Sequence, residues 1–267
     1  MNKPLPEIAG LPVDWNTDAL TFDERLAVKE TKARLRGQLR PVLTNDAACE
    51  PADGVQYWMY NGISLPEHAQ TFAELGIQYE LTLLYPRWLG AERSKTLGHI
   101  HTYPPEGKIN YAEVCEVLSG EAIFVFQTLD VENRRASFCQ AVRASAGEKV
   151  VFPPKLHHFT INAGDDVLLF ADLISVHARG NYDGLSAMRG GAYRYGSDWT
   201  LNSTYEYAAP LVVREAEDYS DRALTRDVPL YELIWRAPEQ LRWLNEPESF
   251  SQCFPELAAN LPPHLLG

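Results

Sequence analysis

Short runs of apolar and aromatic residues recur through the middle of the chain, with glycine, asparagine or aspartate between them. Runs of this length rich in valine, isoleucine, phenylalanine and tyrosine are typical of strands. The segment 162–166, NAGDD, has the composition of a hairpin connection. The pattern predicts an all-β barrel or sandwich. The runs are VQYWMY, which begins at Val55, then IQYELTLLYP, AIFVFQTL, SFCQAV, KVVFP, HFTIN and VLLFADLIS.

The two ends of the chain show a different pattern. Residues 21–39 carry charges of alternating sign, which predicts an exposed helix starting near Asp23. Beyond about Leu201, the segments LVVREAEDYSDRAL and LYELIWRAPEQLRWL have helical spacing of apolar residues, broken by prolines. We expect an N-terminal extension with a helix (1–54), a barrel (55–200) and a C-terminal helical extension (201–267). The aromatic residues of the last segment, Tyr231, Trp235 and Trp243, are expected to pack on the barrel or to form a dimer surface.

A candidate metal site lies within the β-rich region. His99 and His101 are two residues apart, and on a strand they would project from the same face. Glu113 follows in AEVCEVLSG, and His158 follows in PPKLHHFTIN. Three imidazoles and one carboxylate are a common ligand set for a divalent transition metal. We therefore predict one metal ion per chain, held by these four residues and drawn from Fe, Mn, Ni, Zn or Co.

The other histidines are weaker candidates. His157 would face away from His158 on a strand, and we expect it to point outward, with an exchange of the two roles as the alternative. His68, His177 and His264 have no such partners and are expected to be solvated or hydrogen-bonded.

Composition narrows the function classes. A net charge of −12 opposes non-specific binding to nucleic acid or anionic lipid. The sequence contains no run of about 18 apolar residues, so no membrane span is expected. The N-terminus has no apolar signal region. We therefore expect a cytoplasmic protein, in which the four scattered cysteines are free thiols. An anionic substrate would need a local group of donors.

The flanks of the histidines supply such donors. Upstream of His99, the chain carries the hydroxyls of Thr82 and Thr96, and Gly98 allows close approach of the backbone. Lys95 could add a positive charge. Hydroxyls, backbone N–H groups and a nearby cation are the usual partners of phosphate oxygens.

The two histidine-bearing blocks resemble the signature motifs of the cupin superfamily. That resemblance implies a mainly-β fold, a cupin double-stranded β-helix (jelly-roll) barrel, here with helical extensions at both ends. Two differences are visible: eleven residues, TYPPEGKINYA, separate His101 from Glu113, and Lys155 stands where many cupins have glycine. The longer segment contains prolines and glycine and predicts a loop at the mouth of the barrel.

Longer segments resemble the cupin-type glucose-6-phosphate isomerases of archaea and some bacteria. The resemblance spans roughly residues 55–184 and rests on VQYWMY, TLLYPRWLGAERSKTLGHIH, YAEVCEVLSGEAIFVFQ, VVFPPKLHHFTINAGDD and NYDG. It implies a phosphorylated sugar as substrate, a homodimer, and the metal ligands already named. It also implies a phosphate and sugar site formed by Tyr57, Thr82, Thr96, Gly98 and Tyr182. Three positions depart from the family: Cys115 stands where it has a tyrosine, a second pocket tyrosine of the family falls near Ile174, and a pocket histidine falls near Gly180.

Isomerisation of an aldose to a ketose moves hydrogen between C1 and C2. It needs a base and a cation that stabilises the developing negative charge. Glu113 is the candidate base, and a direct hydride shift is the alternative that would leave it a ligand only. Two other functions compete: a cupin metal-dependent dioxygenase, whose pocket is commonly apolar, and a non-catalytic sugar-binding cupin.

Overall fold

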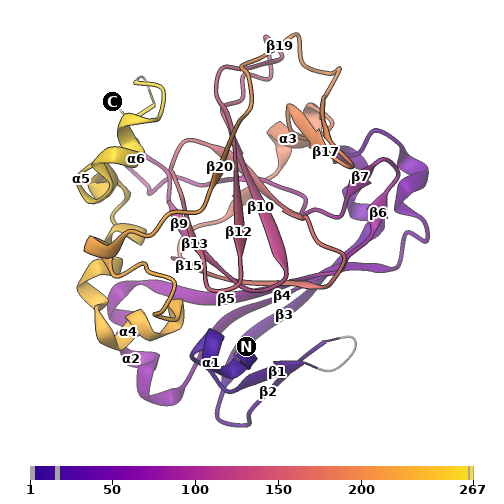
Figure 1. The fold of residues 1–267 in the computed structure, drawn as a ribbon. Coiled ribbons are helices and arrows are strands. Elements are labelled where there is room, and N and C mark those ends of the chain that lie inside the picture. The colour runs from indigo at the N-terminus through magenta and orange to yellow at the C-terminus, as the bar shows by residue number, and fades with distance from the viewer. Residues whose placement is uncertain (1–3, 16–18, 264, 267) are drawn as a thin grey trace.

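The computed structural model describes residues 4–15, 19–263 and 265–266 and shows a mainly-β molecule (Figure 1). One sheet has six strands in the order β13-β9-β15-β5-β4-β3, and a second has four in the order β14-β10-β12-β20. The six strands are, in chain order, β3 (Ala27–Leu35), β4 (Val55–Ser64), β5 (Ile77–Leu84), β9 (Glu113–Ser119), β13 (Lys149–Phe152) and β15 (Leu168–Ser175). The four are β10 (Glu121–Gln127), β12 (Cys139–Ser145), β14 (His157–Asn162) and β20 (Val212–Glu215).

Shorter elements surround the two sheets. The remaining strands are β1 (Val13–Trp15), β2 (Leu20–Phe22), β6 (Trp88–Leu89), β7 (Glu92–Arg93), β8 (Ile100–His101), β11 (Arg135–Ala136), β16 (Gly180–Asn181), β17 (Tyr193–Tyr195), β18 (Trp199–Leu201) and β19 (Tyr207–Ala208). The α-helices are α1 (Leu5–Ala9), α2 (Ala69–Leu75), α3 (Asp183–Ala187), α4 (Leu233–Arg236), α5 (Phe250–Cys253) and α6 (Pro255–Ala259). The 3₁₀ helices are η1 (Arg36–Val42), η2 (Asp46–Cys49), η3 (Pro66–His68), η4 (Ser220–Arg222), η5 (Leu230–Glu232), η6 (Pro238–Leu244) and η7 (Pro247–Ser249).

The six-stranded sheet is covered on both faces. Cys115 and Val117 of β9 pack toward β10, β12 and β14 in a core between the two sheets. Val114 and Leu118 point to the opposite face, where Trp243 and other residues of the C-terminal segment cover them. A strand with both faces buried reads as a continuous apolar run, which explains why all eight residues of β15, LLFADLIS, are buried. The predicted mainly-β class is therefore confirmed, with the layered sheets expected of a jelly roll.

The predicted exposed helix at 21–39 is wrong. Its central residues form β3, which pairs antiparallel with β4 at the edge of the six-stranded sheet. Charged side chains such as Lys29, Glu30 and Lys32 suit an edge strand because water solvates them and they block further pairing. A run of mixed charge is thus compatible with either an exposed helix or an edge strand. This segment forms a strand because it pairs with β4.

The C-terminal segment is helical only from Ser220 onward. In LVVREAEDYSDRAL, predicted to be helical, the first part forms β20, which pairs parallel with β12. The later helices are short and several begin at proline, as the prolines in the sequence indicated. Tyr231 and Trp243 are buried against the six-stranded sheet, and Figure 1 shows these helices beside β9 and β5. The division of the chain near residues 54 and 200 remains a prediction.

The NAGDD turn reverses the chain, but it does not join a hairpin. Asn162 Oδ1 accepts a hydrogen bond from the Gly164 N–H, and its Nδ2 donates to the Asp166 carbonyl. The strands on either side, β14 and β15, belong to different sheets. The turn residues predicted the change in direction correctly, whereas the pairing partners were set by the long-range arrangement of strands.

Candidate metal centre and substrate cavity

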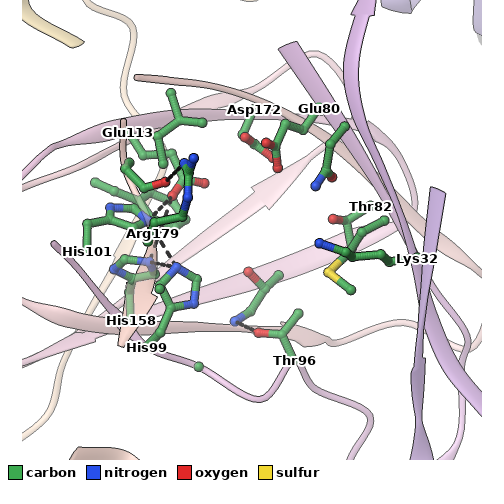
Figure 2. A pocket seen from close by; sticks show the side chains of 18 of the residues that line it. Lys32, Glu80, Thr82, Thr96, His99, His101, Glu113, His158, Asp172 and Arg179 are labelled. Atoms are coloured by element: carbon green, nitrogen blue, oxygen red, sulfur yellow. Dashed lines mark hydrogen bonds and ion pairs between the residues drawn. The ribbon is translucent and has the colours of Figure 1, made fainter. Parts of the chain in front are cut away.

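The four predicted metal ligands come from three places in the sequence and meet in one cluster. His101 ends β8, Glu113 begins β9, and His158 lies in β14. Residues His99 and His158 exchange backbone hydrogen bonds of 3.0 and 2.8 Å, which fixes the two segments side by side. One ligand atom from each of the four side chains lies within 4.8 Å of all the others. Figure 2 shows the three rings and the carboxylate converging from one side of the cavity.

The imidazole nitrogens are oriented for coordination. His99 Nε2 lies 2.9 Å from His101 Nε2 and 3.2 Å from His158 Nε2, and His101 Nε2 lies 3.3 Å from Glu113 Oε2. The Nδ1 atom of His101 is 3.1 Å from the Tyr111 carbonyl oxygen, so the proton on that nitrogen leaves Nε2 with a free lone pair. An outer hydrogen bond of this kind is typical of metal-binding histidines.

Burial sets the charge state of the cluster. It lowers the pKa of His99 and His158 well below the ordinary value, and that of His101 to about 4, so the rings are neutral. It raises the pKa of the Glu113 carboxyl to about 8. Within the described part of the chain, Glu113 has ion-pair contacts only with His101 and His158. Neutral imidazoles and a buried carboxylate that lacks a Lys or Arg partner fit a divalent cation.

The cluster lines a cavity of about 520 Å³ that also contains the five residues predicted to bind phosphate and sugar: Tyr57, Thr82, Thr96, Gly98 and Tyr182. The structure therefore brings all nine predicted residues to one cavity. The Thr96 hydroxyl oxygen accepts a hydrogen bond from the Thr160 N–H, 3.0 Å away, so its proton can be donated elsewhere. Gly98 has φ +78°, and a Cβ there would lie 2.7 Å from a Leu185 carbon and 2.8 Å from Phe159 Cβ, so glycine is required.

Two carboxylates in the cavity, the buried Asp172 and the half-buried Glu80, were missed by the sequence analysis. Glu80 of β5 and Asp172 of β15 are direct neighbours across the sheet, and Figure 2 shows them together near Glu113. Burial raises the pKa of Glu80 to about 7, and burial together with the charges of Glu80 and Glu113 raises that of Asp172. A signal existed: Asp172 interrupts the apolar run LLFADLIS, and Glu80 lies two residues before Thr82, on the same face.

Lys95, expected to supply positive charge to the site, lies elsewhere. Its ammonium group is buried 2.5 Å from Glu92 Oε2 and donates to the Val42 carbonyl, and it does not line the cavity. The cations that do line the cavity include Arg34, Lys32 and Arg179. The first two belong to β3, the strand that the sequence analysis placed in a helix.

The three departures from the family have a structural setting. The Cys115 Sγ–H donates to Glu113 Oε1 at 3.0 Å, so the thiol contacts the candidate base without lining the cavity. Ile174 lines the cavity opposite Glu113 on the neighbouring strand. A Cβ at position 180 would lie 3.0 Å from both the His99 ring and the Tyr182 hydroxyl, so a histidine does not fit there without rearrangement.

The remaining histidines lie apart from the cluster. His157 does not line the cavity, and its Nδ1 is buried without a hydrogen-bond partner among the described residues. His68 stacks on Trp235 with ring centroids 4.5 Å apart. The predicted role of His264 lies outside the described residues.

The long loop between His101 and Glu113 is tied to the C-terminal segment. Glu248 Oε1 accepts hydrogen bonds from the backbone N–H groups of Lys108 and Ile109, at 3.0 and 3.2 Å. Asn110 Nδ2 donates to the His101 carbonyl, and its Oδ1 accepts from the N–H of Lys155, whose φ is +68°. The loop thus links the C-terminal extension to a metal-ligand histidine and to the positive-φ position where cupins often have glycine.

Comparison with known proteins supplies independent information. The profile of the family described as glucose-6-phosphate isomerase (GPI) matches residues 33–209, more than half of the chain. The glucose-6-phosphate isomerase of Pyrococcus abyssi is 26% identical over 184 residues, which cover 69% of this chain and 87% of the relative. That of Pyrococcus horikoshii is 31% identical over 176 residues, covering 66% and 83%. That of Thermococcus litoralis is 33% identical over 106 residues, covering 40% and 50%.

Solved structures similar to this chain include two proteins that act on oxalate. Oxalate oxidase in complex with glycolate aligns at 20% identity and a TM-score of 0.28, covering 37% of this chain and 41% of that one. Oxalate decarboxylase from Bacillus subtilis aligns at 16% identity and a TM-score of 0.33, covering 47% and 28%. At these scores the two structures add nothing to a functional assignment. In the described residues, no helix is long and apolar enough to cross a membrane.

Proposed function

The chain belongs to the glucose-6-phosphate isomerase family, and from that premise we propose how its cavity interconverts glucose 6-phosphate and fructose 6-phosphate. The enzyme is an aldose–ketose isomerase. The main support for this site is one observation: His99, His101, Glu113 and His158 cluster in a cavity that is also lined by hydroxyl groups. A metal cluster beside hydroxyl donors suits a polar, phosphorylated sugar.

The four clustered residues would hold the metal. Their donor set accepts Fe, Mn, Ni, Zn or Co, and availability in the cell often selects among such ions. When bound, the divalent cation would supply Lewis acidity to the sugar oxygens at the carbons that exchange hydrogen. The buried negative charge of Glu113 would then be balanced, which favours its ionised form.

Glu113 is proposed to carry the proton between C1 and C2. Its carboxylate faces the cavity, and the Cys115 thiol holds one of its oxygens by hydrogen bonding. The base must be ionised before it accepts a proton from carbon. If hydrogen instead passes directly between the two carbons, Glu113 serves only as a ligand.

The phosphate is proposed to lie at the hydroxyl-lined part of the cavity. Thr96 and Tyr57 accept backbone hydrogen bonds through their oxygens, at 3.0 and 3.4 Å, so both O–H groups remain able to donate to a phosphate oxygen. Thr82 and Tyr182 line the same cavity. Their hydroxyls, with the backbone at Gly98, would orient the sugar so that C1 and C2 approach the histidine cluster.

The rival functions fit the cavity less well. A dioxygenase pocket would be expected to be apolar or aromatic, whereas this cavity is lined by Glu80, Asp172, Lys32, Arg34 and Arg179. A homodimer remains a prediction that rests on the family resemblance. A reducing compartment such as the cytoplasm is proposed because the four cysteines are free and the substrate is a sugar phosphate.

The test is turnover of fructose 6-phosphate by the purified protein loaded in turn with each candidate metal. We expect glucose 6-phosphate to form, and activity to disappear with a chelator and return with added metal. Absence of turnover with every metal, together with oxygen consumption on candidate substrates, would replace the proposal with an oxygenase function. Running the reaction in deuterated water distinguishes the two mechanisms, because a proton held by Glu113 exchanges with solvent whereas a transferred hydride does not.

A further inference from the structure

Arg34 reaches the substrate cavity from the edge strand β3. It lies opposite Tyr57 in the register of β3 and β4. Its Cζ atom lies 5.3 Å from the centre of the Tyr182 ring, and the side chain lines the cavity. Arg34 is therefore adjacent to two of the residues assigned above to phosphate binding.

The guanidinium group has most of its hydrogen-bonding capacity unused. Its positive charge opposes the rise that burial causes in the pKa of the Tyr57 hydroxyl, and a guanidinium carries five N–H donors. Its Nε–H is buried and has no hydrogen-bond partner among the described residues. Among the described residues, no carboxylate forms an ion pair with the Arg34 guanidinium. Its strand neighbour Lys32, in contrast, pairs with Glu30 at 2.7 Å.

The other cavity arginine is already engaged. Arg179 donates through Nη1 to the carbonyl oxygens of Val176 and Ala178, at 2.8 and 2.6 Å. Lys95, the cation that the sequence suggested, is paired with Glu92 outside the cavity. Arg34 is thus a cation that faces the cavity beside two tyrosines and has no acidic partner in the part of the chain that the structure describes.

A cavity that contains acidic groups favours an anionic substrate only where a cation lies beside the binding position. Glu80, Asp172 and Glu113 all line it, and the whole chain carries a net charge of −12. Hydroxyl groups can donate hydrogen bonds to a phosphate but cannot balance its charge. A planar guanidinium does both, because it donates two parallel N–H bonds to neighbouring phosphate oxygens.

We propose that Arg34 binds the phosphate group of the sugar phosphate, with Tyr57 and Tyr182 holding the guanidinium in place. This inference rests on the proposed function and adds to it the residue that selects phosphorylated over unphosphorylated sugars. It also assigns a role to β3: the edge strand brings a cation from outside the jelly-roll motifs into the substrate cavity.

The experiment compares Arg34→Gln and Arg34→Lys with wild type and with a matched control, Arg36→Gln. Arg36 is two residues along the chain, donates to the Glu50 carbonyl at 3.0 Å and does not line the cavity. The measurements are KM and kcat for fructose 6-phosphate, turnover of fructose, and binding of inorganic phosphate by calorimetry. Circular dichroism establishes that each variant is folded.

We expect Arg34→Gln to raise KM for fructose 6-phosphate, and to weaken phosphate binding, by roughly 10- to 100-fold, the range for lost hydrogen bonds to a charged group. kcat should change by less than about threefold, because the metal cluster and Glu113 are untouched. Arg34→Lys should fall between wild type and Arg34→Gln, since it keeps the charge but loses the two-pronged geometry. Arg36→Gln should match wild type.

A folded Arg34→Gln variant that binds phosphate and fructose 6-phosphate as wild type does would overturn the inference. So would a fall in kcat with no change in KM or phosphate binding, which would place the effect at the metal cluster. If Arg34→Gln does not fold, the test rests on Arg34→Lys. Wild-type phosphate affinity in Arg34→Lys would contradict binding through two parallel N–H donors. If wild type itself fails to isomerise fructose 6-phosphate, the proposed function fails, and phosphate calorimetry still judges Arg34 separately.

Discussion

Two glutamates three residues apart on β9 point to opposite faces of the sheet and have different neighbours. Glu113 faces the cavity and is 7% exposed, whereas Glu116 faces the C-terminal segment and is 1% exposed. Glu116 pairs with Lys149 at 2.7 Å and accepts the Leu230 N–H at 2.7 Å, and Lys149 also donates to two backbone carbonyls. Among the described residues, the polar partners of Glu113 are two neutral imidazoles and a thiol.

This difference separates a structural carboxylate from a functional one. A buried charge is costly unless it is paired and hydrogen-bonded, and Glu116 has a permanent partner within the chain. Glu113 has no such partner in the described residues, so its surroundings are complete only with an added cation. Burial alone therefore does not identify a site, and the identity of the neighbours does.

The largest effect is expected at the structural glutamate. Glu116→Gln would leave the Lys149 ammonium buried without its partner and should lower the free energy of unfolding by about 3–5 kcal/mol. Urea denaturation measures this, with metal content and kcat per folded molecule as controls that should stay unchanged. The double variant Glu116→Gln/Lys149→Met removes both charges and should recover much of the loss. Equal stability of wild type and Glu116→Gln would show that the ion pair has no structural role.

Replacing the functional glutamate should act on catalysis instead. Glu113→Gln, reconstituted with excess metal, should lose at least about 100-fold in kcat, the lower end for removal of a general base. Fructose 6-phosphate should still bind, and the metal-free protein should be no less stable than wild type, because a buried acid without a cation partner has been removed. Near-normal turnover, with no solvent deuterium in the product, would reduce Glu113 to a metal ligand.

The histidine cluster allows a third test with a matched neighbour. His158→Ala should lower metal affinity by at least about 10-fold, since even outer partners of a metal ligand contribute 10- to 100-fold. His157→Ala, one residue away and outside the cavity, should keep wild-type metal content. Elemental analysis after dialysis measures both variants. The reverse result would exchange the roles of the two histidines.

The smallest effect is the change in stability of the metal-free protein between pH 7 and 8. Because the folded-state pKa of Glu113 is raised to about 8 from 4.5, the folded state holds this proton more tightly than the unfolded state. Stability is therefore lost as pH rises from about 4.5 to 8, at up to about 1.4 kcal/mol per pH unit. The lowered pKa of His101, about 4, acts oppositely and only below pH 6.5, where falling pH reduces stability.

The informative window is pH 7 to 8, because it lies above the pKa of about 7 of the Glu80 and Glu116 carboxyls and therefore contains less of their titration than of that of Glu113. Urea denaturation in the presence of a chelator should show declining stability there, and Glu113→Gln should flatten the decline. Added metal should also flatten it. A decline that is the same in wild type and Glu113→Gln would assign the effect to other groups.

The sequence alone identified residues whose relation is local or follows a motif. The alternation of side chains on a strand made His99 and His101 partners, and the motif spacing added Glu113 and His158. Thr82, Thr96 and Gly98 were found in the sequence that flanks the histidines, and the family resemblance added Tyr57 and Tyr182. All five line the cavity. The mainly-β class followed from the repeated apolar runs.

Only the tertiary structure decided which distant segments meet. It placed residues of the supposed N-terminal helix in β3, which delivers Arg34 to the cavity, and it set Asp172 beside Glu80. It also paired Glu116 with Lys149 and left Glu113 without a Lys or Arg partner among the described residues, although the two glutamates share one strand. The physical reason is that strand pairing and charge compensation depend on partners far away in the chain, whereas periodicity and motif spacing are properties of short segments.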